Sequence, residues 1–319
     1  MPIIQRRQFL KLGGLAACAA AVSGCGTLAE ATADERRRRF VATPCGDVAC
    51  LMRGSGPAAL FLHGFPLNAD QWRDSLTALA PYRRCIAPDF LGLGFTRVGA
   101  GVDVGPETQV RMLIALLDAL GIAAADVIAN DSGGAVAQLL LARHPDRVRT
   151  LLLTNCDTEI ESPPAAMRPV IELAKQGRFA DEWLAPWLAN PALARSPQGI
   201  GGLCYSNPMQ PTDAALRSYF TPLLSSPERK RRVHEYAIAL EDNPLAGIGP
   251  ALAASRVPVR VVWGVDDTIF SAAGADHLAH AFGNSHGVRR LENAKLFWPE
   301  ERPDVIAAQA RILWESAAG

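Results

Sequence analysis

The feature that most constrains the fold is a strand-like run over residues 126–129 that is followed, a few residues later, by a helix-like run over 134–143. The same alternation recurs along the chain. Further strands are predicted at 58–62, 84–88, 148–154, 257–263 and 287–291, and further helices at 69–79, 109–120 and 304–314, after an opening hairpin of 40–43 and 48–52. Strands that alternate with helices at this spacing form a parallel sheet covered on both faces. The sequence therefore predicts an α/β fold with a mostly parallel, doubly wound sheet.

The sharp turn between the run at 126–129 and the helix after it presents one side chain at its tip. Such a turn strains the backbone and needs small residues two positions before and two positions after the tip. With Asp131 at the tip these residues are Ala129 and Gly133, and both are small. With Ser132 at the tip the earlier residue is Asn130, which is large for the position. The spacing favours Asp131, whose carboxylate the N-terminus of the following helix would stabilise, and leaves Ser132 as the weaker alternative.

The alternation of strands and helices stops between residues 157 and 252. Proline and tryptophan are scattered through a mainly helical pattern there, and no strand is evident in the sequence. A helical insertion between strands of one sheet indicates a cap over the edge where the strands end. We therefore expect a core of residues 39–156 and 253–319 and a helical cap, or lid, of residues 157–252. Apolar side chains of the cap are expected to line a hydrophobic pocket, and these are Trp183, Trp187, Phe220 and Leu223.

Residues 1–25 have the pattern of an export signal. Paired arginines, Arg6 and Arg7, precede a short apolar stretch that is far below the ~20 residues needed to span a bilayer. The segment resembles a twin-arginine signal, which is a receptor-read address. Val22-Ser23-Gly24-Cys25 resembles a lipobox, which predicts lipidation of Cys25 and attachment to a membrane, with ordinary cleavage as the alternative. We therefore expect a periplasmic or cell-surface protein with a lipid anchor.

Charge gives no reason to expect a nucleic-acid partner, because Lys+Arg and Asp+Glu both number 32. A basic run, Arg36-Arg37-Arg38-Arg39, ends an expected linker over 26–38 and is interpreted as solvated, with contact to anionic lipid as the alternative.

Cys45 and Cys50 flank a tight turn and are interpreted as packing residues, with a disulfide as the alternative. The sequence has no metal-ligand spacing such as CxxC or HExxH, so neither a metal nor another cofactor is expected. The oligomeric state stays open.

Two further motifs stand at the ends of predicted strands. His63-Gly64-Phe65-Pro66 follows the strand predicted at 58–62, and Val262-Trp263-Gly264-Val265-Asp266-Asp267 spans the end of the one predicted at 257–263. Together with the turn at Asp131, and in this order, the motifs resemble the α/β-hydrolase fold. The resemblance is to the branch that holds epoxide hydrolases and haloalkane dehalogenases, and it covers residues from about 40 to 316.

The resemblance implies a role for each residue of the motifs. Asp131 would be the nucleophile, and the backbone N–H groups of Phe65 and Ser132 would form an oxyanion hole. Asp267 would be the catalytic acid that orients or polarises a base. Asp157, which directly follows a predicted strand, is a second position for that acid.

One position departs from the family's pattern. The resemblance implies a histidine shortly before a Glu-Arg-Pro helix start, and counting back from Glu301-Arg302-Pro303 places Leu296 there. An aspartate can form an alkyl ester from an epoxide or a halide, but hydrolysis of the ester needs a base that activates water. His234 in the cap and Lys295 beside the departing position are the candidate substitutes. The histidines interpreted as structural or surface residues are His63, His277, His280 and His286.

Two side chains narrow the choice of substrate. Haloalkane dehalogenases usually carry a tryptophan after the nucleophile and often an asparagine in the oxyanion loop, where this chain has Ser132 and Phe65. Epoxide hydrolases use cap tyrosines to protonate the epoxide oxygen, and the candidates here are Tyr205, Tyr219 and Tyr236. We therefore expect a hydrolase of the epoxide-hydrolase type for a small apolar substrate, impaired in hydrolysis by the missing histidine. The alternatives are a degenerate hydrolase fold that binds a ligand or acts non-hydrolytically, and an esterase that uses Ser132.

Overall fold

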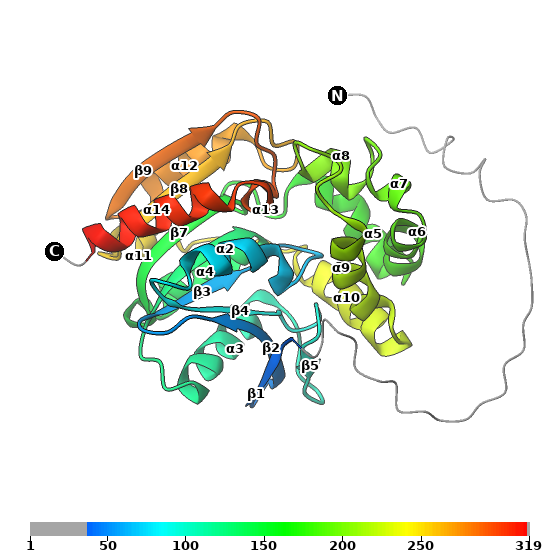
Figure 1. The fold of residues 1–319 in the computed structure, drawn as a ribbon, viewed down its shortest axis with the longest axis horizontal. Helices are drawn as coiled ribbons and strands as arrows, with labels where there is room; N and C mark the ends of the chain where they lie inside the picture. Colours follow the sequence, from blue (N-terminus) through cyan, green and yellow to red (C-terminus); the bar gives the residue numbers. More distant parts are fainter. Residues whose placement is uncertain (1–36, 318–319) are drawn as a thin grey trace, which may run out of the picture. The chain divides into compact units, whose positions relative to one another are not determined.

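The computed structural model describes residues 37–317 of the chain. Within them nine strands form one sheet in the order β1-β2-β4-β3-β6-β7-β8-β9, and β5 pairs with β2 (Figure 1). The strands are β1 (Arg39–Thr43), β2 (Gly46–Arg53), β3 (Ala58–Leu62), β4 (Arg84–Pro88), β5 (Arg97–Val98), β6 (Ala125–Asp131), β7 (Val148–Cys156), β8 (Val259–Gly264) and β9 (Ser285–Leu291). Neighbours from β4 across to β9 are parallel, whereas β2 runs antiparallel to β1, β4 and β5. This is the predicted α/β architecture with a mostly parallel sheet.

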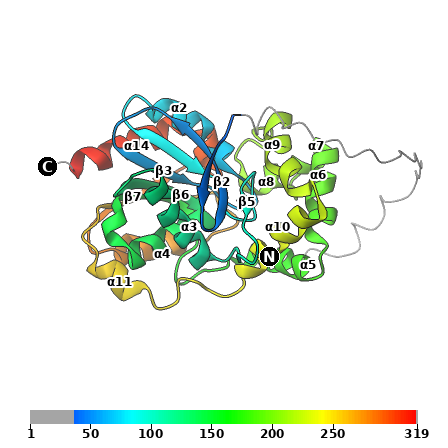
Figure 2. The same ribbon diagram turned by 90° about the horizontal axis from the view of Figure 1, so that it is seen from below.

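Helices cover both faces of the sheet, because the strand side chains alternate between two apolar layers. The core helices are α2 (Arg73–Leu79), α3 (Pro106–Ala119), α4 (Ser132–Arg143), α11 (Gly249–Ala254), α12 (Ala272–Ala281), α13 (Trp298–Glu301) and α14 (Pro303–Ser316), with the helical turns η2 (Ala69–Trp72) and η3 (Pro145–Arg147). In β3, Leu60 packs in one layer with α3 and α4, and Phe61 packs in the other with α2 and α14. Figure 2 shows these two pairs of helices on opposite sides of the sheet. The strand between them is buried along its whole length, as expected for a parallel strand covered on both faces.

Between β7 and β8 the chain is helical and forms the cap. Its helices are α5 (Arg168–Lys175), α6 (Ala185–Ala189), α7 (Pro191–Ala194), α8 (Ile200–Cys204), α9 (Asp213–Leu224) and α10 (Pro227–Ala239), with the helical turns η4 (Ala165–Met167) and η5 (Ala180–Leu184). They gather on one side of the sheet in Figure 1, coloured green to yellow. The cap lies at the edge where β6 ends, since the Tyr236 hydroxyl of α10 is 3.2 Å from Ser132 Oγ at the start of α4.

The two long cap helices begin at residues that satisfy their open N–H groups. Thr212 Oγ1 accepts from the Ala215 N–H at 3.1 Å before α9, and Ser226 Oγ accepts from the Arg229 N–H at 3.2 Å before α10. Pro227 is the first residue of α10, where a missing N–H leaves no partner unpaired. Serine and threonine are preferred at the residue just before a helix, because their side-chain oxygens accept from N–H groups of the first turn. Local sequence thus sets where α9 and α10 start, and these helices carry two of the candidate tyrosines.

Arg38 is buried, which corrects the prediction that the basic run before β1 is a solvated linker. Its side chain is 0% exposed, with Nε 3.0 Å from Asp89 and Nη2 3.0 Å from Asp70. The guanidinium also lies 4.2 Å from the centroid of the Phe95 ring. Arg37 contacts Asp70 as well, but half of its side chain is exposed. A buried charge needs partners. The sequence of four consecutive arginines does not indicate which of them is buried and paired.

The cysteines of residues 37–317 are free and buried, and they are Cys45, Cys50, Cys85, Cys156 and Cys204. Cys45 and Cys50 are therefore packing residues in this structure, and the alternative of a disulfide between them does not hold. No helix among residues 37–317 is long and apolar enough to cross a membrane. The predicted export signal, the lipidation site Cys25 and the linker up to residue 36 lie outside the described residues.

Candidate active site

The tip of the turn between β6 and α4 is Asp131, whose φ is 55° and ψ is −133°. This backbone conformation is costly for a residue with a side chain. Two glycines make the turn possible. A Cβ on Gly133 would lie 2.6 Å from the Leu62 carbonyl oxygen, and a Cβ on Gly134 would collide with Cys156. The spacing of the turn predicted a small residue at Gly133. The need for a glycine at position 134 follows only from the close approach of α4 to β7.

Two backbone amides hold the Asp131 carboxylate. The Phe65 N–H donates to Oδ2 at 2.9 Å, and the Ser132 N–H donates to the same carboxylate. Gly64 allows this approach, because a Cβ there would lie 2.5 Å from Oδ2. Preorganised amides of this kind stabilise negative charge as it develops. The two residues predicted to supply an oxyanion hole are thus brought together on the candidate nucleophile.

The residue before the tip, Asn130, joins four segments of the site. Its Nδ2 donates to the carbonyl oxygens of Asn155 and Leu296, each at 3.0 Å. Its Oδ1 accepts from Gln71 Nε2 at 2.7 Å, and Gln71 Oε1 accepts from the Gly64 N–H at 2.9 Å. Buried polar groups of this kind are paired as a rule. The sequence reasoning used Asn130 only as an argument against a Ser132 tip, and it missed Gln71. A polar residue at the end of an apolar strand was the available signal.

Asp267 follows β8 at the same edge of the sheet and is fixed by several donors. Its Oδ2 accepts from Asn155 Nδ2 at 2.8 Å, and its Oδ1 accepts from the Ile269 N–H at 2.8 Å. Asn155 also exchanges two hydrogen bonds with the backbone of Gly264, at 2.7 and 2.9 Å. Burial raises the pKa of Asp267 to about 6, against these hydrogen bonds, which favour the charged form. The predicted acid is therefore held in one orientation, and Asn155, which the sequence reasoning did not single out, holds it there.

Asp157 directly follows β7, the strand next to β6. The residue is 4% exposed, and Ser162 Oγ donates to its Oδ1 at 2.8 Å. Gln138 Nε2 of α4 donates to its backbone carbonyl at 2.8 Å. Burial raises the pKa of the Asp157 carboxyl to about 6. The sequence reasoning named this residue only as a second position for the acid, and the structure places it beside the candidate nucleophile.

Asp131 lies at the same edge of the sheet as two other carboxylates, Asp157 after β7 and Asp267 after β8. Its pKa is raised well above the ordinary value, first by burial, then by the charge of Asp157 and to a lesser extent by that of Asp267. The hydrogen bonds from Phe65 and Ser132 oppose this rise. Among residues 37–317 no arginine, lysine or histidine forms a salt bridge with any of the three carboxylates. The site is therefore an acidic edge that lacks a compensating cation within the described part of the chain.

Leu296 occupies the position where the resemblance implies a histidine. It is 3% exposed, and its carbonyl oxygen accepts from Asn130 Nδ2 at 3.0 Å. Two residues earlier, the Ala294 carbonyl accepts from the Asp266 N–H at 3.1 Å. The loop 294–296 therefore bridges the ends of β8 and β6, beside the two strands that carry candidate carboxylates. An isobutyl side chain there neither accepts nor donates a proton.

His63 and His234 form hydrogen bonds with backbone groups and not with the carboxylates of the site. His63 Nε2 accepts from the Phe90 N–H at 3.0 Å and its Nδ1 donates to the Gly64 carbonyl at 2.9 Å, so it braces the oxyanion loop. Burial lowers its pKa to about 4, which keeps the ring neutral. His234 Nε2 accepts from the Ala180 N–H at 3.0 Å inside the cap, and burial lowers its pKa too. Within residues 37–317 no histidine is hydrogen-bonded to a carboxylate of the site, and His234 is not brought to Asp131.

Lys295 is also directed away from the candidate nucleophile. Its Nζ donates to the Gly202 carbonyl at 2.6 Å. It lies near the Cys204 thiol, whose pKa is raised by burial and by the charges of Asp267 and Asp131. Of the remaining histidines, His144 caps the C-terminus of α4, His277 and His280 lie on α12, and His286 lies near the start of β9. The structure brings none of the proposed substitute bases onto the carboxylate.

Two of the three candidate tyrosines belong to a separate buried network. The hydroxyls of Tyr205 and Tyr219 donate to Glu300 at 2.7 and 2.9 Å. Arg73 Nη1 forms an ion pair with the other oxygen of Glu300 at 2.7 Å. Burial and the Glu300 charge raise the pKa of both phenols. These contacts join α8 and α9 of the cap to α2 and α13 of the core, so both tyrosines serve the attachment of the cap.

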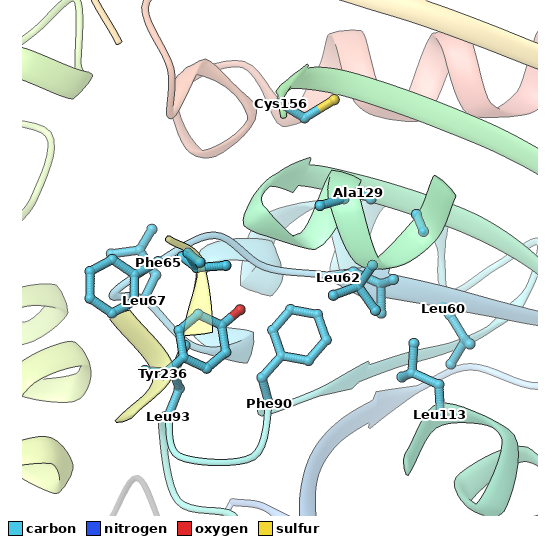
Figure 3. Packing of buried hydrophobic residues seen from close by; sticks show 14 of the residues in the cluster. Leu60, Leu62, Phe65, Leu67, Phe90, Leu93, Leu113, Ala129, Cys156 and Tyr236 are labelled. Carbon is cyan, nitrogen blue, oxygen red and sulfur yellow. The ribbon is translucent and has the colours of Figure 1, made fainter. Parts of the chain in front are cut away.

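Tyr236 is the tyrosine that reaches the turn. Its hydroxyl shares a hydrogen bond with Ser132 Oγ at 3.2 Å. Its ring stacks on Phe65 with 5.6 Å between centroids and 4° between planes, and it lies 6.4 Å from the Phe90 ring. Figure 3 shows the Tyr236 ring between these two phenylalanines. Burial raises its pKa, and the charges of Asp131 and Asp157 add to the rise against the hydrogen bond with Ser132.

An aromatic series continues from Phe65 into the cap. Phe179 stacks on Phe65 at 5.7 Å, Trp183 follows at 5.9 Å, and Trp187 follows at 5.7 Å. Phe220 closes the series 6.0 Å from Trp187. Rings at these spacings add to the energy of simple burial. Three of the four side chains predicted to line an apolar pocket, Trp183, Trp187 and Phe220, thus belong to one row of packed aromatic rings that ends on the oxyanion loop.

Comparison with known proteins gives this geometry a context. The family described as alpha/beta hydrolase fold matches residues 57–295. Haloalkane dehalogenase 2 from Mycobacterium tuberculosis is 27% identical over 263 residues, which cover 80% of this chain and 87% of that protein. Among solved structures, haloalkane dehalogenase DbeA from Bradyrhizobium elkani is 25% identical with a TM-score of 0.69, covering 88% of this chain and 99% of that one. The epoxide hydrolase CorEH, at 21% identity, has a TM-score of 0.72 over 88% of this chain and 98% of its own, which shows the fold alone.

Proposed function

Because the chain belongs to the α/β-hydrolase fold family, and is a hydrolase of that fold, we propose that it opens small apolar epoxides by attack of Asp131 on a ring carbon. The observation that carries the proposal is the Asp131 carboxylate, at the tip of a strained turn with Oδ2 held 2.9 Å from the Phe65 N–H. Because Oδ2 accepts from the Phe65 N–H, Oδ1 is the proposed attacking atom. The product of this step is an alkyl ester of Asp131 whose carbonyl oxygen stays on the two amides.

The nucleophile must be ionised to attack. Burial and the charge of Asp157 raise the pKa of Asp131, so the attacking fraction grows as the pH rises through that pKa. The same burial removes the water that would otherwise solvate the carboxylate, and fixed amide dipoles take its place. We therefore expect a reactive carboxylate with an alkaline pH dependence of the first step.

Opening of the epoxide leaves an oxygen that needs a proton, and Tyr236 is proposed to supply it. Its hydroxyl is 3.2 Å from Ser132 Oγ, one residue past the nucleophile. The raised pKa of the phenol keeps it protonated until an alkoxide, a much stronger base, forms beside it. The hydrogen bond with Ser132 then steadies the phenolate, which regains a proton from water when the product leaves.

The pair of hydroxyls also favours an epoxide over an alkyl halide. Two of the relatives described above are named haloalkane dehalogenases, and that branch usually holds the halide with a tryptophan after the nucleophile. Here that residue is Ser132, hydrogen-bonded to a phenol. A phenol can deliver a proton to a leaving oxygen, which a halide does not need. Ser132 as an esterase nucleophile has less support, since its hydroxyl pairs with Tyr236 and no histidine within residues 37–317 is hydrogen-bonded to it.

A second candidate function rests on Leu296. With a leucine at the position of the base, an ester on Asp131 could persist, and the protein would then serve as a ligand-binding or covalent-capture protein of the same fold. The buried side chain of Leu296 and its fixed carbonyl are the observations that favour it. The two candidates share the first step and differ in whether the ester is hydrolysed.

Intact-mass measurement of the purified protein with a panel of epoxides, alkyl halides and esters tests both candidates. Under the leading proposal an epoxide is turned over, and a quenched sample carries one added epoxide mass on the peptide with Asp131. Asp131→Asn removes adduct and turnover while the protein stays folded, since asparagine keeps the shape. A stable adduct without turnover supports the second candidate. Reaction of halides but not of epoxides, or an adduct on Ser132, would overturn the choice of epoxide or of nucleophile.

We further propose that the protein acts after export, attached to a membrane by a lipid on Cys25. The support is the sequence alone, the paired arginines Arg6 and Arg7 and the lipobox-like residues that end at Cys25. Labelled palmitate should be incorporated by the wild type and not by Cys25→Ser. Replacement of both arginines by lysine should leave the precursor in the cytoplasm, and unchanged export of that variant would contradict a twin-arginine route.

A further inference from the structure

Asp157 stands next to Asp131 through the register of the sheet. Asp131 and Cys156 are partners in the parallel strands β6 and β7, so Asp157 is the first residue past the edge on the neighbouring strand. Gln138 of α4 donates to its backbone carbonyl at 2.8 Å. The helix that begins behind the nucleophile therefore also fixes the backbone of Asp157, and the relative position of the two carboxylates is set by secondary structure rather than by a flexible loop.

The Asp157 carboxylate keeps more capacity to accept a proton than Asp267 does. Within residues 37–317 its donors are Ser162 Oγ, at 2.8 Å, and its own backbone N–H. Asp267 accepts from Asn155 Nδ2 and from the N–H groups of Ile269 and Phe270. A carboxylate has about four acceptor sites. Asp267 is therefore occupied in holding the end of β8, while Asp157 has room to accept from a water molecule.

The strand order places β7 between β6 and β8, so along the edge of the sheet Asp157 is nearer to Asp131 than Asp267 is. Asp157 and Asp131 both raise the pKa of the Tyr236 phenol, whereas Asp267 and Asp131 both raise the pKa of the Cys204 thiol. Asp157 is thus the second carboxylate that acts on Tyr236, where the epoxide oxygen is proposed to leave, while Asp267 acts on Cys204 at the end of α8.

We propose that Asp157 is the general base for hydrolysis of the Asp131 ester, in place of the histidine that Leu296 replaces. This rests on the proposed function. Asp157 accepts one proton from a water molecule as the water oxygen bonds to Cγ of Asp131, and the carbonyl electron pair moves onto the oxygen held by Phe65 and Ser132. Collapse of this intermediate breaks the bond between Cγ and the alkyl oxygen. The proton passes from Asp157 to that oxygen, which leaves as the hydroxyl of a diol. Asp131 is left as a carboxylic acid, and it becomes a carboxylate again when it releases the second proton of the water molecule to solvent.

Single-turnover intact-mass measurement with 1,2-epoxyhexane tests the assignment. General bases contribute about 10²–10⁴ in rate, so the Asp157→Asn ester should live at least ~100-fold longer than the wild-type ester. Asp126→Asn is the control, because it makes the same change at a buried carboxylate near the opposite end of β6, where Asp126 is paired with Arg83 and Arg149. Its ester should live less than ~10-fold longer than that of the wild type. Asp157→Glu, which keeps a carboxylate, should recover part of the lost rate.

A second readout separates a base from a structural residue. Removal of the Asp157 charge lowers the pKa of Asp131, so Asp157→Asn should form the ester at lower pH than the wild type while hydrolysing it more slowly. A misfolded site would slow both steps. Equal ester lifetimes in the wild type and Asp157→Asn, whether short or long, overturn the role of Asp157 and leave the proposed function standing. If neither protein forms an ester with any epoxide, the proposed function fails and this inference fails with it.

Discussion

The backbone carbonyl of Leu296 accepts a hydrogen bond from the side chain of Asn130, 3.0 Å away, and this contact fixes the loop that replaces the family's histidine beside the turn that carries Asp131. The leucine is therefore held in register with the site. Its side chain is buried, so it fills space that an imidazole would otherwise fill. The departure from the family pattern is a change of one side chain on an intact scaffold.

An intact scaffold implies that the missing histidine can be put back. In the Asp157→Asn background, Leu296→His should shorten the life of the Asp131 ester by about 10²-fold or more, because position 296 is fixed next to the turn of Asp131 by Asn130 and an imidazole there can act as a base. The measurement is ester decay by intact mass after a single dose of epoxide. Leu296→Met in the same background is the control for a changed volume and should leave the decay unaltered. A folded Leu296→His double variant with unchanged decay would show that position 296 does not face the ester.

Tyr236→Phe should slow reaction with epoxides far more than reaction with alkyl halides. The variant keeps the ring stacked on Phe65 and removes the hydroxyl that is hydrogen-bonded to Ser132. Loss of a general acid should lower the rate of ester formation from 1,2-epoxyhexane by about 10²-fold, and by less than ~3-fold from 1-bromohexane, whose leaving group needs no proton. Tyr219→Phe is the control, since its hydroxyl donates to Glu300. Equal losses with both substrates would contradict a role in protonation.

Much of the fold follows from local sequence. The runs at 58–62 and 84–88 coincide with β3 and β4, because a parallel strand covered on both faces is a nearly continuous apolar run. β5, of two residues, was missed, since so short a bridge has no pattern of its own. The predicted helix at 69–79 is divided into η2 and α2.

The site was predictable only where a backbone rule constrains it. The turn at Asp131 is encoded by small neighbours, and the amide of Phe65 by a motif, so both could be read from the sequence. The contacts of Tyr205 and Tyr219 depend on Glu300, which is about 80 to 95 residues away in sequence, and no local pattern records such a partner. The same is true of Arg38 with Asp70 and Asp89. Side-chain pairing between distant segments is fixed by packing, which a single sequence does not display.

Arg38→Met should destabilise the protein strongly. Asp70 and Asp89 would stay buried without the guanidinium, and breaking a buried pair in this way typically costs about 3–5 kcal/mol. The free energy of unfolding from urea denaturation at pH 7.5 measures it. Arg37→Met is the matched control, because Arg37 also contacts Asp70 but has 51% of its side chain exposed. Exposed pairs contribute about 0–1 kcal/mol, so a loss of comparable size in both variants would show that burial of Arg38 is not the cause.

The pH dependence of stability should carry the sign of the raised pKa at Asp157. Its carboxyl has a pKa of about 6 in the folded protein and 3.8 as the ordinary value. Between these values the folded state binds more protons than the unfolded state, so the free energy of unfolding falls as the pH rises from about 4 to about 6. At 1.36 kcal/mol for each pKa unit, the full penalty above pH 6 is about 3 kcal/mol. Asp157→Asn cannot ionise, and its stability relative to the wild type should rise by about 2–3 kcal/mol between pH 4 and pH 7.5.

Asp70 supplies the control of opposite sign for this measurement. Its pKa is lowered, since the charge of Arg38 and the hydrogen bond from Ser218 outweigh burial. The stabilisation it gives is present above the ordinary pKa and is lost as the pH falls through the lowered one. Asp70→Asn should therefore lose stability relative to the wild type as the pH rises, while Asp157→Asn gains it. Urea denaturation of the three proteins at pH 4, 5.5 and 7.5 gives both slopes. If the two variants changed in parallel, the carboxylate beside Asp131 would not be a buried, destabilising charge, and its capacity to act as a base at neutral pH would lose its physical ground.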